Sequence, residues 1–291
     1  MKKKISLLIC LGLSIINVGC VNQSQEMQQV AQEVSIVSTS VTICEILDAM
    51  QVENVIGIPA STSYTIPKRY EEAISVGAPM NPDIEILASL NPTYILSPKS
   101  LESDLGVKYD NAKLSAYFMD LSSTKSMYES IIGLGELLDE QGQAQMLKDE
   151  FASYMKDYQE NAVTSKQPKV LLLMGLPGTY VVATDKSYAG SLVALAGGEN
   201  VYDDDKEAFL NINPEDMLSK NPDVILLTSH ALPEQVKKMF EDEFSNNTIW
   251  SRFQAVQEER VYTLNNEKFG MSANFQYQEA LQDLQEIFYE K

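Results

Sequence analysis

The sequence is poor in the residues that build most metal centres and cross-linked extracellular folds. Its 291 residues include one histidine, His230, and three cysteines, Cys10, Cys20 and Cys44. A single imidazole cannot complete a structural zinc site, which draws on several histidines or cysteines. Cys10 and Cys20 fall within or directly after an N-terminal export signal, so Cys44 would have no internal disulfide partner. The folded part must therefore be stabilised by its own hydrophobic core.

Positive charge is also scarce. Lysine and arginine total 22 against 41 aspartates and glutamates, which gives the chain a net charge of −19. This excess of negative charge disfavours nucleic acid as a partner and disfavours electrostatic adhesion to an anionic membrane. Attachment to a membrane would have to come from a lipid anchor alone.

The N-terminus has the pattern of an exported bacterial lipoprotein. Three lysines at positions 2–4 precede a short apolar run and then Gly19-Cys20. This pattern predicts a signal peptide over residues 1–19, lipidation of Cys20, and a location at the extracellular face of the cell membrane. A plain secreted protein is the alternative, because Asn17 stands where lipoprotein signals usually carry an apolar residue. Residues 20–33, which are polar and rich in glutamine, then form a flexible tether.

Beyond the tether, short apolar runs alternate with helical patterns. The predicted strands are VSIVSTS (34–40), VENVIGIP (52–59), TYILSP (93–98), AYFMDL (116–121), KVLLLMG (169–175), TYVVAT (179–184), DVILLTS (223–229) and RVYTLN (260–265). Helical patterns lie between them, as in residues 126–138 and 188–197. This alternation predicts an α/β fold with largely parallel sheets.

One segment near the middle of the chain breaks this alternation. Residues 141–165 contain no proline, and their large apolar side chains recur on one helical stripe: Leu147, Phe151, Tyr154, Met155 and Tyr158. The spacing predicts one long connecting helix, which Pro168 ends. This helix separates an N-terminal lobe, residues 34–140, from a C-terminal lobe, residues 166–291.

The two lobes also share a repeat. PDIEILASLNPTYIL (82–96) aligns with NPEDMLSKNPDVIL (213–226), so that Asn91 meets Asn221 and Glu85 meets Glu215. Asn-Pro is common between a helix and a strand, and coincidence is one explanation of the match. The explanation we favour is that the chain forms two similar α/β lobes joined by a rigid helix.

Together these features resemble the helical-backbone, or class III, substrate-binding proteins of ABC importers. Five stretches narrow the resemblance to the haem-binding lipoproteins of Gram-positive bacteria, of the iron-regulated surface determinant E type: SVGAPMNPDIEIL, LLLMGLPGTYVVAT, SYAGSLVALAGGENVY, NPDVILLTSHALPEQVKKMFEDEF and IWSRFQAVQEERVYTL. The resemblance implies a protein that binds haem between two lobes and delivers it to an ABC permease for iron acquisition. Its partners would be haem, a permease dimer and upstream surface haem-transfer proteins, and the protein itself would be a monomer.

In the resembled family, one methionine and one histidine from opposite lobes hold the haem iron. The matching residues are Met80, in GAPMNP, and His230, in TSHALP. His230 follows a predicted strand, which is where ligand crevices form in α/β sheets, although a surface or capping role is the ordinary alternative. A porphyrin supplies four nitrogens, so one imidazole and one thioether complete the iron coordination. The resemblance also implies that Glu85 and Glu215 each meet one permease subunit, whereas an acid in the first turn also stabilises a helix by itself.

Haem propionates need hydrogen-bond donors, and this chain has few positive charges to provide them. The candidates lie at a predicted helix start and in a following loop that also carries Lys68 and Arg69: Ser38, Thr39, Ser40, Val41, Ser61, Thr62, Ser63 and Tyr64. Helix capping and turn formation are the alternative roles of these hydroxyls. The pocket walls are expected from side chains that could equally belong to the core: Met174, Leu176, Tyr180, Tyr188 and Phe269.

The sequence lacks a recognisable catalytic motif. The glycines of GLPG (175–178) and LAGG (195–198) do not form a phosphate-binding loop, and no G-x-S-x-G elbow precedes the one histidine. We therefore expect a binding protein and not an enzyme. The alternatives are a siderophore- or cobalamin-binding lipoprotein of an ABC importer and, from another class, a haem-dependent enzyme.

Overall fold

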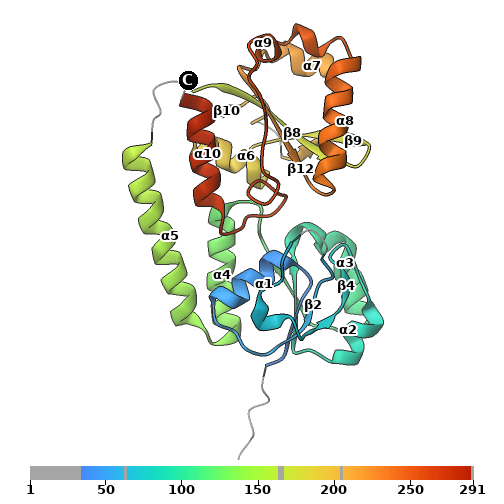
Figure 1. Ribbon diagram of the computed structural model, residues 1–291. Helices are drawn as coiled ribbons and strands as arrows, with labels where there is room; N and C mark the ends of the chain where they lie inside the picture. Colours follow the sequence, from blue (N-terminus) through green and yellow to red (C-terminus); the bar gives the residue numbers. More distant parts are fainter. Residues whose placement is uncertain (1–33, 62–63, 163–166, 204–205, 290–291) are drawn as a thin grey trace, which may run out of the picture. The chain divides into compact units, whose positions relative to one another are not determined.

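The computed structural model describes residues 34–61, 64–162, 167–203 and 206–289 (Figure 1). The predicted signal peptide, Cys20 and the tether lie outside the described residues. In the described part, no helix is both long and apolar enough to cross a membrane.

The N-terminal lobe is built on a five-stranded sheet in which every neighbouring pair of strands is parallel. In spatial order the strands are β3 (Ile74–Ser75), β2 (Val55–Ile58), β1 (Ile36–Ser38), β6 (Tyr94–Pro98) and β7 (Ala116–Met119). The elements between them are α1 (Val41–Ala49), the short 3-10 helices η1 (Lys68–Tyr70) and η2 (Lys99–Leu101), the hairpin of β4 (Gly77–Ala78) and β5 (Asn81–Pro82), α2 (Ile84–Leu90) and α3 (Glu102–Asn111). The parallel arrangement predicted from the apolar runs is thus found in full in this lobe.

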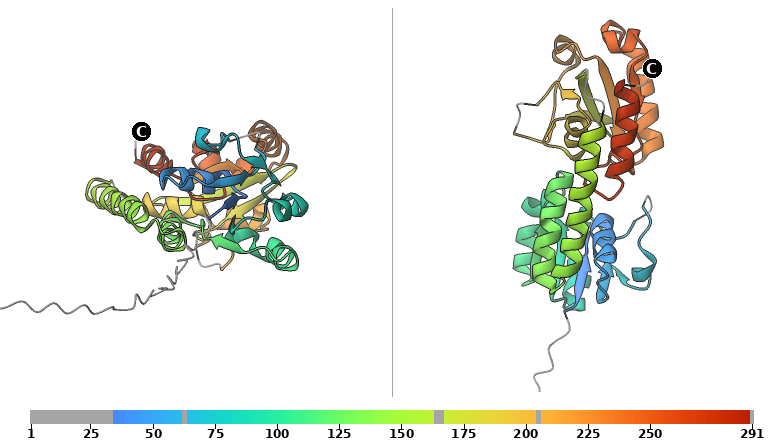
Figure 2. Two further views of the ribbon diagram at one scale, coloured as in Figure 1. Left: turned by 90° about the horizontal axis from the view of Figure 1, so that it is seen from below. Right: turned by 90° about the vertical axis from the view of Figure 1, so that its left-hand side faces the viewer.

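Two long helices, α4 (Thr124–Leu138) and α5 (Gln141–Asn161), lie in the chain between the two sheets. The helix expected over residues 141–165 has 21 residues and ends where Ala162 turns to an extended conformation. Its apolar stripe packs on the core, where Phe151 stacks on Tyr128 of α4 and Tyr154 meets Tyr277 edge to face. Figure 2 shows α5 beside α4 and α10 (Tyr277–Tyr289).

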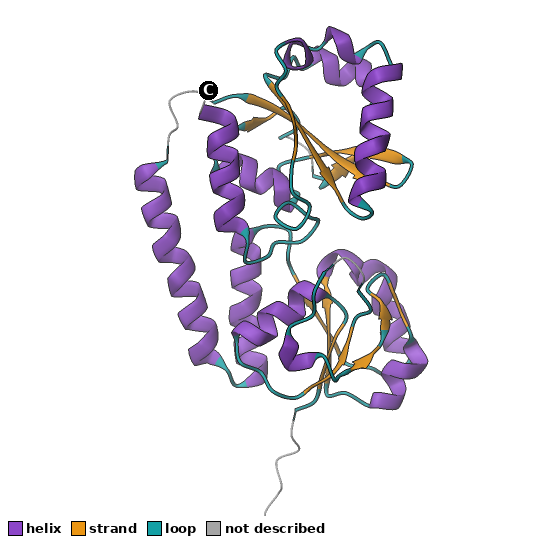
Figure 3. Ribbon diagram, viewed as in Figure 1, coloured by secondary structure: helices purple, strands orange, loops and turns teal. Residues whose placement is uncertain are grey.

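The C-terminal lobe has a mixed sheet in the order β11-β9-β8-β12-β13, with β10 beside the start of β8. The strands are β8 (Lys169–Leu176), β9 (Thr179–Ala183), β10 (Glu199–Asn200), β11 (Phe209–Leu210), β12 (Val224–Ser229) and β13 (Val261–Thr263). The helices are α6 (Tyr188–Leu195), α7 (Pro214–Ser219), α8 (Pro233–Asn246), η3 (Trp250–Arg252), α9 (Gln254–Gln257) and α10. Figure 3 shows helices on both faces of the sheets of the two lobes.

The second sheet is largely parallel, as expected, and its antiparallel strands lie at one edge. β9 and β11 are antiparallel to their neighbours, because β8 turns straight back into β9 through Pro177-Gly178. Gly178 has a φ of +84°, a conformation that an L side chain rarely adopts, so the GLPG sequence permits this tight turn.

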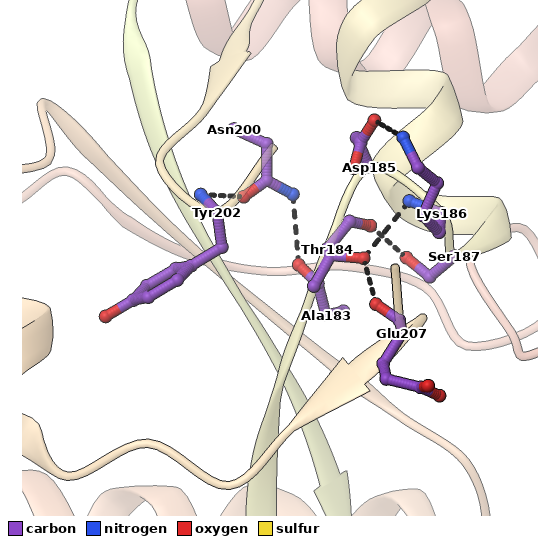
Figure 4. Close-up of polar contacts among 8 residues, drawn as sticks. All are labelled: Ala183, Thr184, Asp185, Lys186, Ser187, Asn200, Tyr202 and Glu207. Carbon is purple, nitrogen blue, oxygen red and sulfur yellow. Dashed lines mark hydrogen bonds and ion pairs between the residues drawn. The ribbon is translucent and has the colours of Figure 1, made fainter. Parts of the chain in front are cut away.

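A network of polar contacts fixes the end of β9 (Figure 4). The Thr184 hydroxyl donates to the backbone oxygen of Glu207 at 2.7 Å and accepts from the Lys186 amide at 3.1 Å. The Asn200 side chain donates to the backbone oxygen of Ala183 at 3.0 Å and accepts from the amide of Tyr202 at the same distance. These bonds tie β9, β10 and the chain before β11 into one rigid edge, away from the strand end that carries His230.

The sequence repeat has a structural counterpart. α2 leads into β6, and α7 leads into β12, with Asn91 and Asn221 at the equivalent junctions. Both asparagines have a left-handed backbone conformation, with φ of 46° and 49°. This conformation ends each helix before the proline that follows. β6 and β12 each pair in parallel with the first strand of their own lobe. The explanation by two similar lobes is therefore confirmed.

Candidate functional site

His230 lies directly after β12, a strand whose six residues are all buried. Its backbone N–H donates to the oxygen of Gly175 at 3.1 Å, which anchors the residue to the end of β8. The side chain is half-buried, and this burial lowers the pKa of the imidazole. The ring is therefore neutral near pH 7, the state in which a nitrogen can bind iron. Among the described residues, no hydrogen bond reaches the ring.

Met80 occupies the tip of a small hairpin in the N-terminal lobe. β4 and β5 pair Gly77 with Pro82 and Ala78 with Asn81, so Met80 falls in the two-residue turn between them. The side chain of Met80 is 63% exposed. A methionine with so little burial does not stabilise the core, and its thioether is open to a ligand.

The hydroxyls before α1 form a local turn and bonds within the sheet, so they do not cap the helix. The Thr39 and Ser97 hydroxyls share a hydrogen bond of 2.7 Å, and the Ser38 hydroxyl donates to the backbone oxygen of Ser40 at 2.8 Å. Ser38 and Thr39 are fully buried, so the expectation that they contact a ligand is wrong. Ser40 stands at the N-cap of α1, but no side chain caps this helix. The first turn of α1, beginning at Val41, keeps its backbone donors uncapped by side chains.

Ser61 and Tyr64 are joined by two hydrogen bonds. The Ser61 hydroxyl donates to the Tyr64 oxygen at 2.7 Å and accepts from the Tyr64 amide at 3.0 Å. Thr62 and Ser63 lie outside the described residues. Tyr64 is 37% exposed, and its hydroxyl lies 3.8 Å from where a Cβ on Gly270 would stand. Arg69, the nearby cation, already pairs with Asp48 at 2.8 Å and with Glu53.

Most of the expected pocket walls prove to be core. Met174, Tyr188 and Phe269 are at most 1% exposed, so their assignment to a pocket wall is wrong. Met174 lies on β8, Tyr188 on α6 and Phe269 in the loop after β13, and all three belong to one hydrophobic core cluster. Sequence alone does not separate this role from a ligand contact. Tyr180 and Leu176 are partly exposed, and the Tyr180 hydroxyl donates to Glu243 at 3.2 Å.

The two glutamates of the repeat occupy equivalent places. Glu85 lies in the first turn of α2 and Glu215 in the first turn of α7, and both are exposed. The hydrogen-bonding caps are other residues: Asp83 accepts from the amides of Glu85 and Ile86, and Asn213 accepts from the amide of Asp216. The glutamate carboxylates are therefore not needed to cap their helices, although they still favour the helix dipoles.

A family model described as "Periplasmic binding protein" matches residues 36–267. The chain belongs to the periplasmic binding protein family. It is 39% identical over 277 residues to the high-affinity heme uptake system protein IsdE of Staphylococcus aureus, with 94% of each chain covered.

Two solved structures support this relationship. The structure of S. aureus IsdE complexed with heme is 40% identical and matches with a TM-score of 0.84, covering 88% of this chain and 99% of that one. An ABC transporter substrate-binding protein from Listeria monocytogenes EGD-e is 42% identical with a TM-score of 0.83, covering 89% and 100%. Both relatives have the two-lobed class III fold, so the predicted fold class is confirmed.

Family membership also decides what class of protein this is. The matched relatives are substrate-binding transport proteins, which confirms the expectation of a binding protein and not an enzyme. A location on the outer side of the cell membrane is consistent with this family. Within the described residues, no group of three or more His, Cys, Asp or Glu side chains is arranged to hold a metal ion.

Proposed function

We propose that this protein binds haem as its transported substrate and delivers it to an ABC importer for iron acquisition. The observation that carries the proposal is His230, the one histidine of the chain, which is half-buried at a strand end in a fold shared with a haem complex at 40% identity. A lone imidazole suits a cargo that brings four nitrogen ligands of its own.

His230 and Met80 are the proposed axial ligands of the haem iron, one from each lobe. Burial keeps the imidazole neutral, and the exposed thioether does not titrate, so both ligands are ready to bind at neutral pH. Sulfur and imidazole are suitable ligands for haem iron, whereas hard ions prefer oxygen. With both axial positions filled, the iron would have no vacant site for redox catalysis, which distinguishes the protein from a haem-dependent enzyme.

The propionates are proposed to bind at the start of α1 and at the neighbouring loop. The uncapped backbone donors near Ser40 and Val41 sit at the positive end of a helix dipole, which favours an anionic group. The Tyr64 hydroxyl is a further donor, and the Ser61 hydroxyl would exchange its bond to the Tyr64 oxygen for one to a propionate. Thr62 and Ser63 of the same loop complete the proposed set. This arrangement needs no free lysine or arginine, which agrees with the acidic composition.

Glu85 and Glu215 are the proposed docking residues for the importer. They are exposed and equivalent in the two lobes. Asp83 and Asn213 cap α2 and α7, so the glutamate carboxylates are not used as caps. A pseudo-symmetric pair of acids suits a permease dimer, and charges of this kind guide docking at a salt-dependent rate. Upstream surface haem-transfer proteins are the proposed donors of haem, and the protein is proposed to act as a monomer.

The proposed anchoring follows the N-terminal pattern. Removal of residues 1–19 would leave Cys20 to carry the lipid, with residues 20–33 as the tether. The folded part would then consist of lobes 34–140 and 166–291 around the connecting segment 141–165. A single lipid-modified terminus would hold the protein at the extracellular face of the membrane.

A titration followed by the fluorescence of Trp250, the one tryptophan, tests the function directly. Trp250 is fully buried in the C-terminal lobe, and bound haem would quench it by energy transfer. We expect saturable, one-to-one quenching by haem but not by cobalamin or a ferric siderophore, with free tryptophan amide as the control for light absorption. Saturable quenching by cobalamin or the siderophore instead of haem would refute the proposal.

A further inference from the structure

Non-glycine residues with a left-handed backbone lie almost entirely at the C-terminal ends of helices in the described part of this protein. Among the described residues, the non-glycine residues with positive φ are Gln51, Asn91, Lys113, Asp139, Asn221, Leu232 and Glu259. All but Leu232 are polar, and each of these polar residues lies at the C-terminal end of a helix. That is the ordinary position for a left-handed residue, because it closes the last turn.

Leu232 is the exception in both chemistry and place. It is an apolar residue at the N-cap of α8, with φ of 49° and ψ of 57°. Its carbonyl oxygen accepts from the amides of Gln235 and Val236 at 2.9 and 3.0 Å, which locks this conformation. Pro233 follows, and a residue before proline is disfavoured in the right-handed helical region. The chain therefore leaves β12, passes His230, and enters α8 through a fixed and strained leucine.

Stability alone does not explain a leucine here. A left-handed conformation costs free energy for a branched apolar residue, whereas asparagine and glycine adopt it readily. Asparagine is also among the preferred helix N-caps, and α8 has no side-chain cap. The leucine side chain is 47% exposed, so burial in the core does not compensate for the strain. Strained residues of this kind gather at ligand sites.

We propose that Leu232 is a haem-retaining contact, whose isobutyl group packs on the porphyrin on the side that His230 ligates. This inference rests on the proposed haem function. Only Ala231 separates it from His230, and its backbone is fixed by the same junction of β12 and α8. Two of the proposed haem contacts, Tyr64 and Met80, are also large exposed apolar side chains. Together they would give the haem apolar surface on both lobes.

The test is the pair of variants Leu232→Asn and Leu232→Met. Asparagine relieves the strain and removes the apolar contact. We expect the melting temperature of the apoprotein to rise by roughly 2–4 °C, while haem affinity falls about fivefold and haem transfer to excess apomyoglobin quickens. Methionine keeps an apolar side chain, so Leu232→Met should bind haem like the wild type.

Glu259→Asn is the matched control. Glu259 is left-handed and exposed in the same lobe but lies after α9, away from His230 in sequence. This variant should raise the melting temperature of the apoprotein without changing haem affinity.

Four outcomes are informative. A stabilised Leu232→Asn apoprotein with faster haem loss supports the inference. Wild-type haem affinity in Leu232→Asn, with affinity lost in His230→Ala, overturns the inference and leaves the haem function intact. A lower melting temperature of the Leu232→Asn apoprotein overturns the premise of strain. Failure of the wild type to bind haem at all removes the function and this inference together.

Discussion

The two lobes present their proposed iron ligands on very different supports. His230 extends from a buried strand, its amide is bonded to the neighbouring strand, and its ring is half-buried. Met80 sits at the tip of a two-stranded hairpin, with 63% of its side chain exposed. The backbone of the proposed C-terminal ligand is therefore anchored and its ring half-buried, whereas the proposed N-terminal ligand lies on an exposed turn and is free to adjust.

This difference in support between His230 and Met80 predicts which lobe contributes more of the free energy of haem binding. A ligand fixed by its surroundings loses little conformational entropy on binding, whereas an exposed, unbranched methionine loses much of its rotamer freedom. A thioether is also a weaker donor to ferric iron than imidazole. We therefore expect the C-terminal lobe to dominate affinity, and variants of the two ligands should differ accordingly.

The largest effect is expected from His230→Ala. Loss of an outer partner of a metal ligand already lowers metal affinity by roughly 10–100-fold, and loss of the ligand itself should exceed this. The fold should be retained, because the half-buried ring contributes little to the core. Haem titrations measure the loss of affinity, and far-UV circular dichroism checks that the fold is retained. Unaltered haem affinity in a folded variant would remove His230 from the site.

Met80→Ala should weaken haem binding less, by roughly tenfold, or about 1.4 kcal/mol. Its stability without haem should match the wild type, because the side chain is mostly exposed. Met146→Ala is the control, since Met146 is 47% exposed on α5, away from the hairpin. A loss larger than that of His230→Ala would reverse the proposed order of the two lobes.

Low pH should weaken haem binding through His230, which can be protonated, but not through Met80, which does not titrate. Burial lowers the pKa of His230, so protons compete with iron only below the ordinary histidine range. Haem affinity should stay level from about pH 8 to about pH 6.5 and fall below that. Met80→Ala should show the same profile at lower affinity, and His230→Ala should lose this phase. A decline already above neutral pH would contradict a depressed pKa.

The smallest effect on haem binding is expected from Glu85→Ala and Glu215→Ala, because both carboxylates lie on exposed first helical turns. Haem uptake through the importer should nevertheless fall in each, and fall most in the double variant. Glu102→Ala, at the start of α3, is the control for a first-turn acid outside the repeat. If the double variant supports uptake like the control, these residues serve only the helix dipoles.

Local patterns in the sequence predict much of the fold. The stripe from Leu147 to Tyr158 identified α5, and the repeat around Asn91 and Asn221 identified two similar lobes. What sequence patterns missed is the direction in which a short glycine-containing loop turns the chain. The antiparallel β8–β9 pair follows from a two-residue turn that resembles any loop with glycine.

The candidate site was predictable only in part. His230 is conspicuous because it is the one histidine and follows a strand. Ser38 and Thr39 were expected at a ligand, but the Ser38 hydroxyl bonds to the nearby backbone of Ser40, and the Thr39 hydroxyl bonds to Leu96 and Ser97 of β6, distant in the sequence. Leu232 could not be predicted, because a left-handed backbone leaves no mark in a sequence beyond a leucine before a helix-starting proline.

The central claim is that one imidazole and one thioether from opposite lobes ligate the same iron. The visible and near-infrared spectrum of the ferric haem complex, recorded for the wild type, His230→Ala and Met80→Ala, tests it most directly. We predict a low-spin, six-coordinate spectrum with a sulfur-to-iron charge-transfer band in the wild type. That band should vanish in Met80→Ala, and the low-spin pattern should be lost in His230→Ala. A five-coordinate wild type, or a wild-type spectrum in both variants, would contradict the claim.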